Sequence, residues 1–144
     1  MNAILLLHFA ATTALVGLIW IVQIVSYPIM LRVSESDFKK YHPFHCDRIT
    51  FVVGPLILAE TGSAIWLWTQ GFAEPLFLWS LIPLVLTWMS TALIQVPLHL
   101  KSERHYSLQS IKWLIRTNWI RTLTWTCRAL LIAALLYQHL EKHP

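Results

Sequence analysis

The chain has 144 residues and a formal net charge of +4, and it is 56% hydrophobic but only 12% charged. A soluble domain carries about 25% charged residues, so this composition excludes an ordinary soluble protein. The Lys and Arg residues gather in a few segments, which is typical of a membrane topology signal. We therefore expect a lipid bilayer as the surroundings and no nucleic-acid partner.

Four apolar segments make up most of the chain. Each is about as long as the roughly 20 helical residues that cross a bilayer core, and they cover residues 3–25, 49–69, 75–98 and 118–138. The first lacks the basic n-region of a secretory signal, so we expect it to be retained. The sequence predicts an all-α membrane protein of one domain, residues 1–144: a four-transmembrane-helix bundle with two amphipathic cytoplasmic connections.

The first apolar segment carries polar side chains at two levels. His8 lies in its outer half, whereas Gln23 and Tyr27 are four residues apart, share a helix face and lie toward the other side. Pro28 is expected to kink the last turns of this helix.

The first connection, SESDFKKYHPFHCDR, is amphipathic, and Ser34 followed by Asp37 fits a helix start. His42 and His45 are three residues apart and share a face if this stretch is helical. Cys46 lies near a membrane edge and Cys127 falls in the middle of the fourth segment, so we expect no disulfide between them.

The second and third segments add further polar groups. Glu60 is the only acid inside an apolar segment and lies near the middle of the second. Gln95 and His99 are four residues apart in IQVPLHLKS, at the cytoplasmic end of the third segment. A second amphipathic stretch, SLQSIKWLI, then leads into the fourth segment.

The fourth segment keeps one polar face. Asn118, Arg121, Trp125 and Arg128 fall within roughly an 80° arc at 100° per residue. An arginine at the centre of a span costs roughly 2.5–3.5 kcal/mol on the insertion scale. This face must therefore point into the bundle, and we predict that Arg128 forms an ion pair with Glu60 near the midplane.

The basic residues set the expected orientation. They gather in the first and third connections, whereas the second connection (TQGFAEP) and the N-terminal tail have none, and the C-terminal tail has only Lys142. The positive-inside rule then places the basic connections in the cytoplasm and both termini outside. We expect a multi-pass protein of the bacterial inner membrane.

The two halves of the chain share a short pattern. YPIMLR after the first segment and VPLHLK after the third both have a proline followed four residues later by a base. Chance produces such a match about as readily, so we use it only to support a bundle of paired hairpins.

The polar groups converge on one leaflet, with Glu60 and Arg128 as the floor, and intramembrane ionisable residues are functional-site hypotheses by default. The candidate catalytic residues are His42, His45, His99, Arg121, Arg128 and Glu60. The candidate substrate-binding residues are Gln23, Tyr27, Gln95, Asn118 and Trp125. Purely structural roles also stay open. Glu60 and Arg128 could form only a structural ion pair, the amide side chains could form hydrogen bonds between helices, and the histidines could be ordinary interfacial residues. His-x-x-His alone is a weak metal signal, so no metal is assigned.

The stretches YHPFHCDRIT, IQVPLHLKS and TNWIRTLTWTCRALL resemble the anthrone oxygenase-like family of small four-helix membrane proteins, over nearly the whole chain. Fungal members oxidise anthrones to anthraquinones with molecular oxygen and need no obligatory organic cofactor. The resemblance implies an oxidoreductase or oxygenase for a hydrophobic, ring-containing substrate, with residues 118–122 and the histidines lining its site. Arg121 and Arg128 would then stabilise an oxyanion, the histidines would move protons, and Trp125 would stack on the ring.

Two alternatives stay open. The stretch ILLLHFAATTALVGLIW is similar to the start of the HemJ-type protoporphyrinogen oxidases, which implies a b-type haem bound by His8. The other alternative is a small non-enzymatic membrane subunit whose polar face binds a partner helix or a lipid headgroup. A homo-oligomer is compatible with each of these functions.

Overall fold

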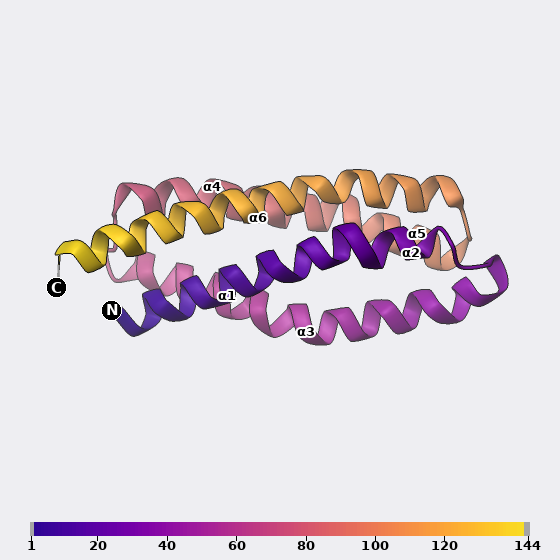
Figure 1. The fold of residues 1–144 in the computed structure, drawn as a ribbon, viewed down its shortest axis with the longest axis horizontal. Coiled ribbons are helices and arrows are strands. Elements are labelled where there is room, and N and C mark those ends of the chain that lie inside the picture. The colour runs from indigo at the N-terminus through magenta and orange to yellow at the C-terminus, as the bar shows by residue number, and fades with distance from the viewer. Residues whose placement is uncertain (1, 143–144) are drawn as a thin grey trace.

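Four long helical rods lie side by side in the computed structural model, which describes residues 2–142 (Figure 1). These residues form helices and short loops and no strand. Four stretches are long and apolar enough to cross a membrane, as the sequence predicted: Ala3–Met30, Glu35–Thr69, Pro75–Arg104 and Leu108–Glu141. In chain order the elements are α1 (Asn2–Ile21), η1 (Val22–Ser26), α2 (Tyr27–Met30), α3 (Glu35–Thr69), α4 (Pro75–Ser90), η2 (Thr91–Gln95), α5 (Val96–Arg104) and α6 (Leu108–Lys142).

The two amphipathic connections are helical and continue directly into the apolar segments that follow them. They form the first turns of α3 and α6, which are 35 residues long each. At 1.5 Å per residue such a helix is about 52 Å long and extends well past a bilayer core of roughly 30 Å. In these stretches Phe38 and Ile111 are buried inside the bundle, whereas Phe44 and Trp113 are exposed.

A π-helical turn interrupts the first and third rods at equivalent places. In η1 the N–H of Tyr27 donates to the carbonyl of Val22, five residues back, and η2 repeats this pattern. Each turn ends two residues before a proline, Pro28 or Pro97, which has no N–H to continue the α-helical hydrogen bonds. One wider turn accommodates the proline, and the rod continues beyond it.

The chain thus consists of two hairpins with the same order of parts. Each has a rod with a π-helical turn, a short loop, and a helix of 35 residues. The two π-helical turns lie just before the two prolines of the repeated sequence pattern, and this agreement supports the relation between the halves. Both hairpins start at the same end of the bundle (Figure 1).

The helices pack unevenly around the bundle. α1 packs against both α3 and α6, and α6 also packs against α4, whereas α3 and α4 make little contact. Within residues 2–142, one hydrogen bond crosses this seam between α3 and α4, from Trp88 Nε1 to Thr61 Oγ1 at 3.2 Å. The bundle is therefore closed on three sides and loosely joined along the fourth.

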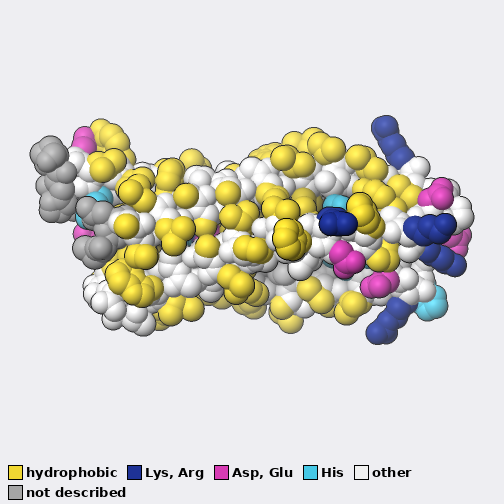
Figure 2. All heavy atoms as spheres, turned by 90° about the horizontal axis from the view of Figure 1, so that it is seen from below, with side chains coloured by type: hydrophobic (Ala, Val, Ile, Leu, Met, Phe, Trp, Pro, Cys, Tyr) yellow, Lys and Arg dark blue, Asp and Glu magenta, His cyan; other side chains and the backbone are white. Residues whose placement is uncertain are grey.

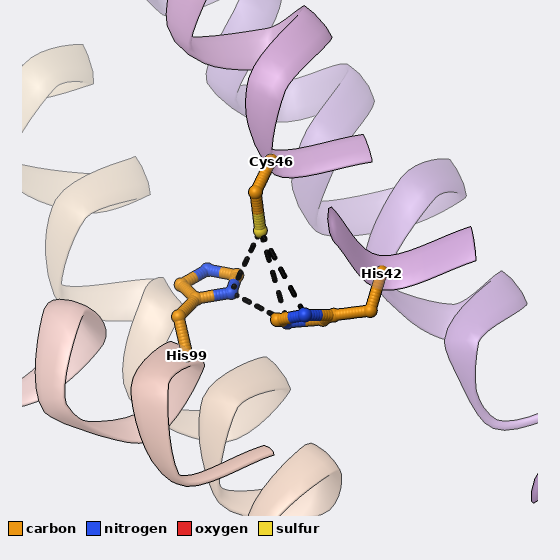
Figure 3. Close-up of side chains that lie close together, drawn as sticks. All are labelled: His42, Cys46 and His99. Atoms are coloured by element: carbon orange, nitrogen blue, oxygen red, sulfur yellow. Dashed lines mark hydrogen bonds between the residues drawn. The ribbon is translucent and has the colours of Figure 1, made fainter. Parts of the chain in front are cut away.

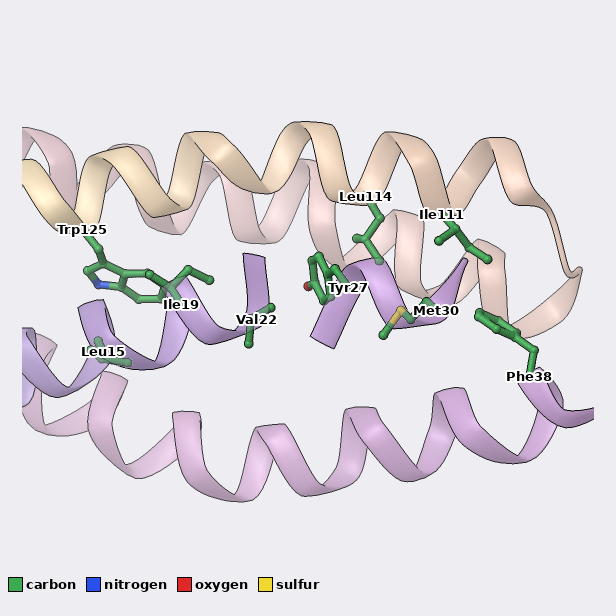
Figure 4. Packing of buried hydrophobic residues seen from close by; sticks show 9 residues of the cluster. All are labelled: Leu15, Ile19, Val22, Tyr27, Met30, Phe38, Ile111, Leu114 and Trp125. Carbon is green, nitrogen blue, oxygen red and sulfur yellow. The ribbon is translucent and has the colours of Figure 1, made fainter. Parts of the chain in front are cut away.

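Buried apolar residues form two clusters along the bundle. The cluster nearer the two connecting loops includes Leu15, Tyr27, Met30, Phe38 and Leu114 (Figure 4). A second cluster, around Leu67, Phe77 and Ile132, packs toward the chain termini. Because lipid tails are as apolar as these side chains, close packing rather than exclusion from water stabilises the helix contacts in a membrane.

The surface separates apolar from charged side chains. Figure 2 shows hydrophobic side chains along the middle of one face, with Lys and Arg gathered toward one end. The exposed basic residues are Arg32, Lys39, Lys40, Arg48, Lys101, Arg104, Lys112 and Arg116. Among the described Lys and Arg side chains, Arg121 and Arg128 are the buried ones. This distribution is typical of a multi-pass membrane protein with one basic end.

Candidate functional site

A buried ion pair joins α3 to α6. Arg128 Nε donates to Glu60 Oε1 at 2.8 Å, which confirms the predicted pairing, and both side chains are essentially inaccessible to solvent. Thr12 Oγ1 donates to the same oxygen at 3.0 Å, and Trp125 Nε1 donates to Oε2 at 3.1 Å. The carboxylate thus accepts hydrogen bonds from two other helices, which offset its loss of water.

His8 completes this ion-pair network. Its Nε2 lies 3.0 Å from an Arg128 nitrogen, and its Nδ1 lies 2.8 Å from Ser63 Oγ. Arginine only donates, so Nε2 accepts and the neutral ring carries its proton on Nδ1. Arg128 also donates to the backbone carbonyl of Ser80. Both ring nitrogens of His8 are therefore engaged, and its surroundings do not fit ligation of a haem iron.

A separate cavity lies nearer the two connecting loops. It has a volume of about 620 Å³ and is lined by parts of α1, η1, α2, α3, α4, η2 and α5, with Arg121 contributed by α6. Most of its wall is apolar, and its polar side chains include His42, His45, His99 and Tyr27. An apolar cavity with a few convergent polar groups is the usual form of a small-molecule site. The predicted shared cavity for the three histidines is confirmed.

Two of these histidines meet a cysteine (Figure 3). His42 Nε2 lies 3.0 Å from His99 Nδ1. Cys46 Sγ lies 3.7 Å from His42 Nε2 and 3.5 Å from His99 Nδ1. His42 and Cys46 are one turn apart on α3, whose helix runs through Pro43 and brings both to the cavity. Cys46 was not among the site residues predicted from the sequence, although it lies four residues after His42 and so shares its helix face.

Neighbouring aromatic groups fix the imidazole rings. The Tyr27 hydroxyl lies 2.9 Å from His99 Nε2. The His42 ring stacks on Phe38 with centroids 5.0 Å apart. His45 stacks on Tyr41, and its Nε2 is buried without a hydrogen-bond partner among residues 2–142. The cavity is therefore lined by a held pair of imidazoles and by a third imidazole, that of His45, whose Nε2 is buried.

Arg121 is a buried cation in the cavity wall, with 9% of its surface exposed. Its guanidinium lies 5.2 Å from the centroid of the Trp125 ring and donates to Asn118 Oδ1 at 3.3 Å. Among the described residues, its Nε has no hydrogen-bond partner and no carboxylate comes within ion-pair distance. A positive charge without a counter-ion at the wall of an apolar cavity favours a ligand with a negative or acidic group.

Other predicted binding residues hold the helices together. Asn118 Nδ2 donates to Gln23 Oε1 at 2.9 Å, and Gln23 Nε2 donates to the carbonyl of Ile115 at 3.1 Å. Neither side chain lines the cavity, nor does Trp125, which contacts Arg121 and Glu60 instead. Gln95 does line the cavity, where Ser90 holds its side-chain oxygen at 2.9 Å.

The cavity reaches the apolar surface along the seam between α3 and α4. Leu58 and Trp88 line it and are 71% and 43% exposed, and Leu100 lines it from α5. A molecule dissolved among lipid tails could enter here without crossing the charged end. On the polar face of α6, by contrast, Asn118 and Arg128 are held by partners within the chain.

Comparisons of the chain with protein-family models, curated proteins and solved structures found no match.

Proposed function

We propose that the protein is an integral membrane oxidoreductase or oxygenase. Its substrate would be a hydrophobic, ring-containing molecule with an acidic hydroxyl or enol, taken from the bilayer into the cavity. The observation that carries this proposal is the uncompensated Arg121 charge in the wall of an apolar cavity that reaches the lipid-facing surface. The oxidative class comes from the resemblance to the anthrone oxygenase-like family.

The cavity supports a specific division of work. Arg121 would stabilise the oxyanion formed when the substrate loses a proton, because a fixed charge in a dry site is worth more than in water. His45 lines the cavity and its Nε2 has no hydrogen-bond partner among the described residues, so we give His45 the role of accepting that proton. Trp125 would hold the Arg121 guanidinium through a cation–π contact, instead of stacking on the substrate as the sequence suggested. The ion pair of Glu60 and Arg128 lies outside the cavity and serves structure.

Anthrone is the probe that tests this proposal, with anthracene as a matched ring system that lacks the oxygen. Binding is followed by quenching of tryptophan fluorescence in detergent, with Trp88→Phe to identify the responding side chain. Oxidation is followed by oxygen uptake and anthraquinone absorbance, where each anthrone consumes one O₂ and releases one water. We expect anthrone to bind more tightly than anthracene and to be oxidised.

The matched variants are Arg121→Gln and Arg116→Gln, since Arg116 is exposed on the same helix. Only the first should weaken anthrone binding and oxidation. Bound anthrone that is never oxidised would contradict the oxygenase class. Equal binding of anthrone and anthracene, unchanged in Arg121→Gln, would contradict the role given to the cavity.

A further inference from the structure

We propose that His42, Cys46 and His99 bind one thiophilic divalent transition-metal ion, such as Zn²⁺. The ion would lie in the cavity assigned above to the substrate. Only a role of the ion in the reaction rests on that proposed function. Ion binding itself follows from the three side chains and is measurable without any substrate.

The spacing of the three ligand atoms matches a tetrahedral site. With a metal–nitrogen distance of about 2.05 Å and a metal–sulfur distance of about 2.3 Å, tetrahedral angles separate two nitrogens by about 3.35 Å and a nitrogen from a sulfur by about 3.6 Å. The corresponding distances are 3.0 Å between His42 Nε2 and His99 Nδ1, and 3.7 and 3.5 Å from these nitrogens to Cys46 Sγ. The two imidazole nitrogens are thus a few tenths of an ångström closer together than this geometry needs, and the two distances to sulfur match it.

The surrounding side chains orient the ligands in advance. When His99 Nδ1 binds a metal, its Nε2 carries the proton and donates to the Tyr27 hydroxyl, which already lies 2.9 Å away. Metal-binding histidines almost always have such a hydrogen bond on the other nitrogen. Phe38 stacks on His42 and fixes the plane of its ring. Little conformational freedom is therefore lost on binding.

The donor set selects the class of ion. One thiolate and two imidazoles suit Zn²⁺ or copper, whereas Mg²⁺ and Ca²⁺ prefer oxygen ligands. Three protein ligands leave a fourth position, as in catalytic rather than closed structural zinc sites. All three residues line the cavity, so the fourth ligand would come from water or from a substrate oxygen there.

Cobalt reports on this site directly. Full-length protein in detergent is stripped with a chelator and titrated with Co²⁺, without any substrate. We expect about one Co²⁺ per chain, with visible d–d bands of a four-coordinate site and a near-ultraviolet charge-transfer band of a cobalt–thiolate bond. Cys46→Ser should lose the charge-transfer band, and His99→Gln should weaken uptake by at least about tenfold. Cys127→Ser, which changes an exposed cysteine on α6, should behave as the unaltered protein.

A second measurement needs no change at the proposed ligands. In Cys127→Ser protein, Cys46 is the remaining cysteine, and Zn²⁺ should slow its labelling by a small maleimide at least about tenfold. A thiol that reacts equally fast with and without Zn²⁺ would overturn the proposal. So would Co²⁺ uptake without a thiolate band, or uptake that Cys46→Ser and His99→Gln leave unchanged. Anthrone binding is measured separately, so its failure is distinguishable from a failure of metal binding.

Discussion

Two buried arginines on α6 have very different surroundings. Arg128 has a carboxylate, an imidazole and a backbone carbonyl as partners, whereas Arg121 has an amide, an aromatic face and a cavity. The first arrangement stabilises one geometry of the bundle, since any loss strands a charge. The second leaves a charge available to a ligand. The same residue type thus has a structural role at one level and a proposed binding role at the other.

The Glu60–Arg128 pair is tested by a double-mutant cycle. Glu60→Gln and Arg128→Gln should each lower the free energy of unfolding by about 3–5 kcal/mol, because one buried charge is left without its partner. The double variant should recover part of this loss, since both charges are then gone. Thermal unfolding in detergent measures the effect, with Lys112→Gln as an exposed control on the same helix. Additive losses would mean that the two residues do not depend on each other.

Arg121 gives the opposite expectation for stability. Arg121→Gln removes a buried charge that has no counter-ion among the described residues, so the unfolding temperature should stay equal or rise. Activity on anthrone should fall by about 10²–10³-fold, the loss typical of one oxyanion-stabilising donor. A fall in unfolding temperature as large as that of Arg128→Gln would instead give Arg121 a structural role.

The π-helical turns link element geometry to the cavity. Pro97 lies two residues after η2 and two residues before His99. The turn holds one residue more than an α-helical turn, so it sets the direction in which the rest of the rod presents its side chains. Pro97 therefore influences the position of the His99 imidazole through the shape of the helix and not through a hydrogen bond.

Pro97→Ala tests this coupling. The substitution restores a backbone N–H and lets the rod return to α-helical bonding, which would rotate His99 by about 100° around the helix axis. Helical content should be unchanged, whereas Co²⁺ uptake should fall to the level of His99→Gln. Pro75→Ala is the matched control, because Pro75 stands at the first position of α4 and no helical bond is lost there. Normal uptake in Pro97→Ala would mean that packing alone maintains the π-helical turn.

At the scale of the whole molecule, the basic end predicts the orientation in the membrane. The exposed Lys and Arg residues of the two connecting loops and adjoining turns should face the cytoplasm, and the turn between α3 and α4 should face outward with both termini. Pro144 lies outside the described residues, so the turn is the better place for a label.

Two single-cysteine variants, each made in a Cys46→Ser/Cys127→Ser background, test the orientation. Glu74→Cys, in the outer turn, should react with an impermeant maleimide in intact cells. Lys40→Cys, near the start of α3, should react only after the membrane is opened. The reverse pattern would place the termini in the cytoplasm and the cavity in the outer half of the membrane.

Much of the architecture was predictable because it depends on local properties. Long apolar runs separated by short polar segments predicted the number of long helices. At 100° per residue, Asn118, Arg121, Trp125 and Arg128 share one face, which predicted the buried face of α6. The pairing of Glu60 with Arg128 also followed from depth alone, since no other acid lay within a span. These inferences need only helix geometry and the cost of charge in lipid.

The tertiary structure decided what the side chains do, because that depends on distances between helices. His8 looked isolated along the chain, yet two other helices, α6 and α3, bring Arg128 and Ser63 to its two nitrogens. Gln23 and Asn118 looked like binding residues, yet they bind each other. Cys46 looked incidental until α5 placed His99 within 3.5 Å of its sulfur. Periodicity gives the face of a helix on which a residue lies. The residues that it contacts depend on how the neighbouring helices are rotated and aligned, and here two π-helical turns change both.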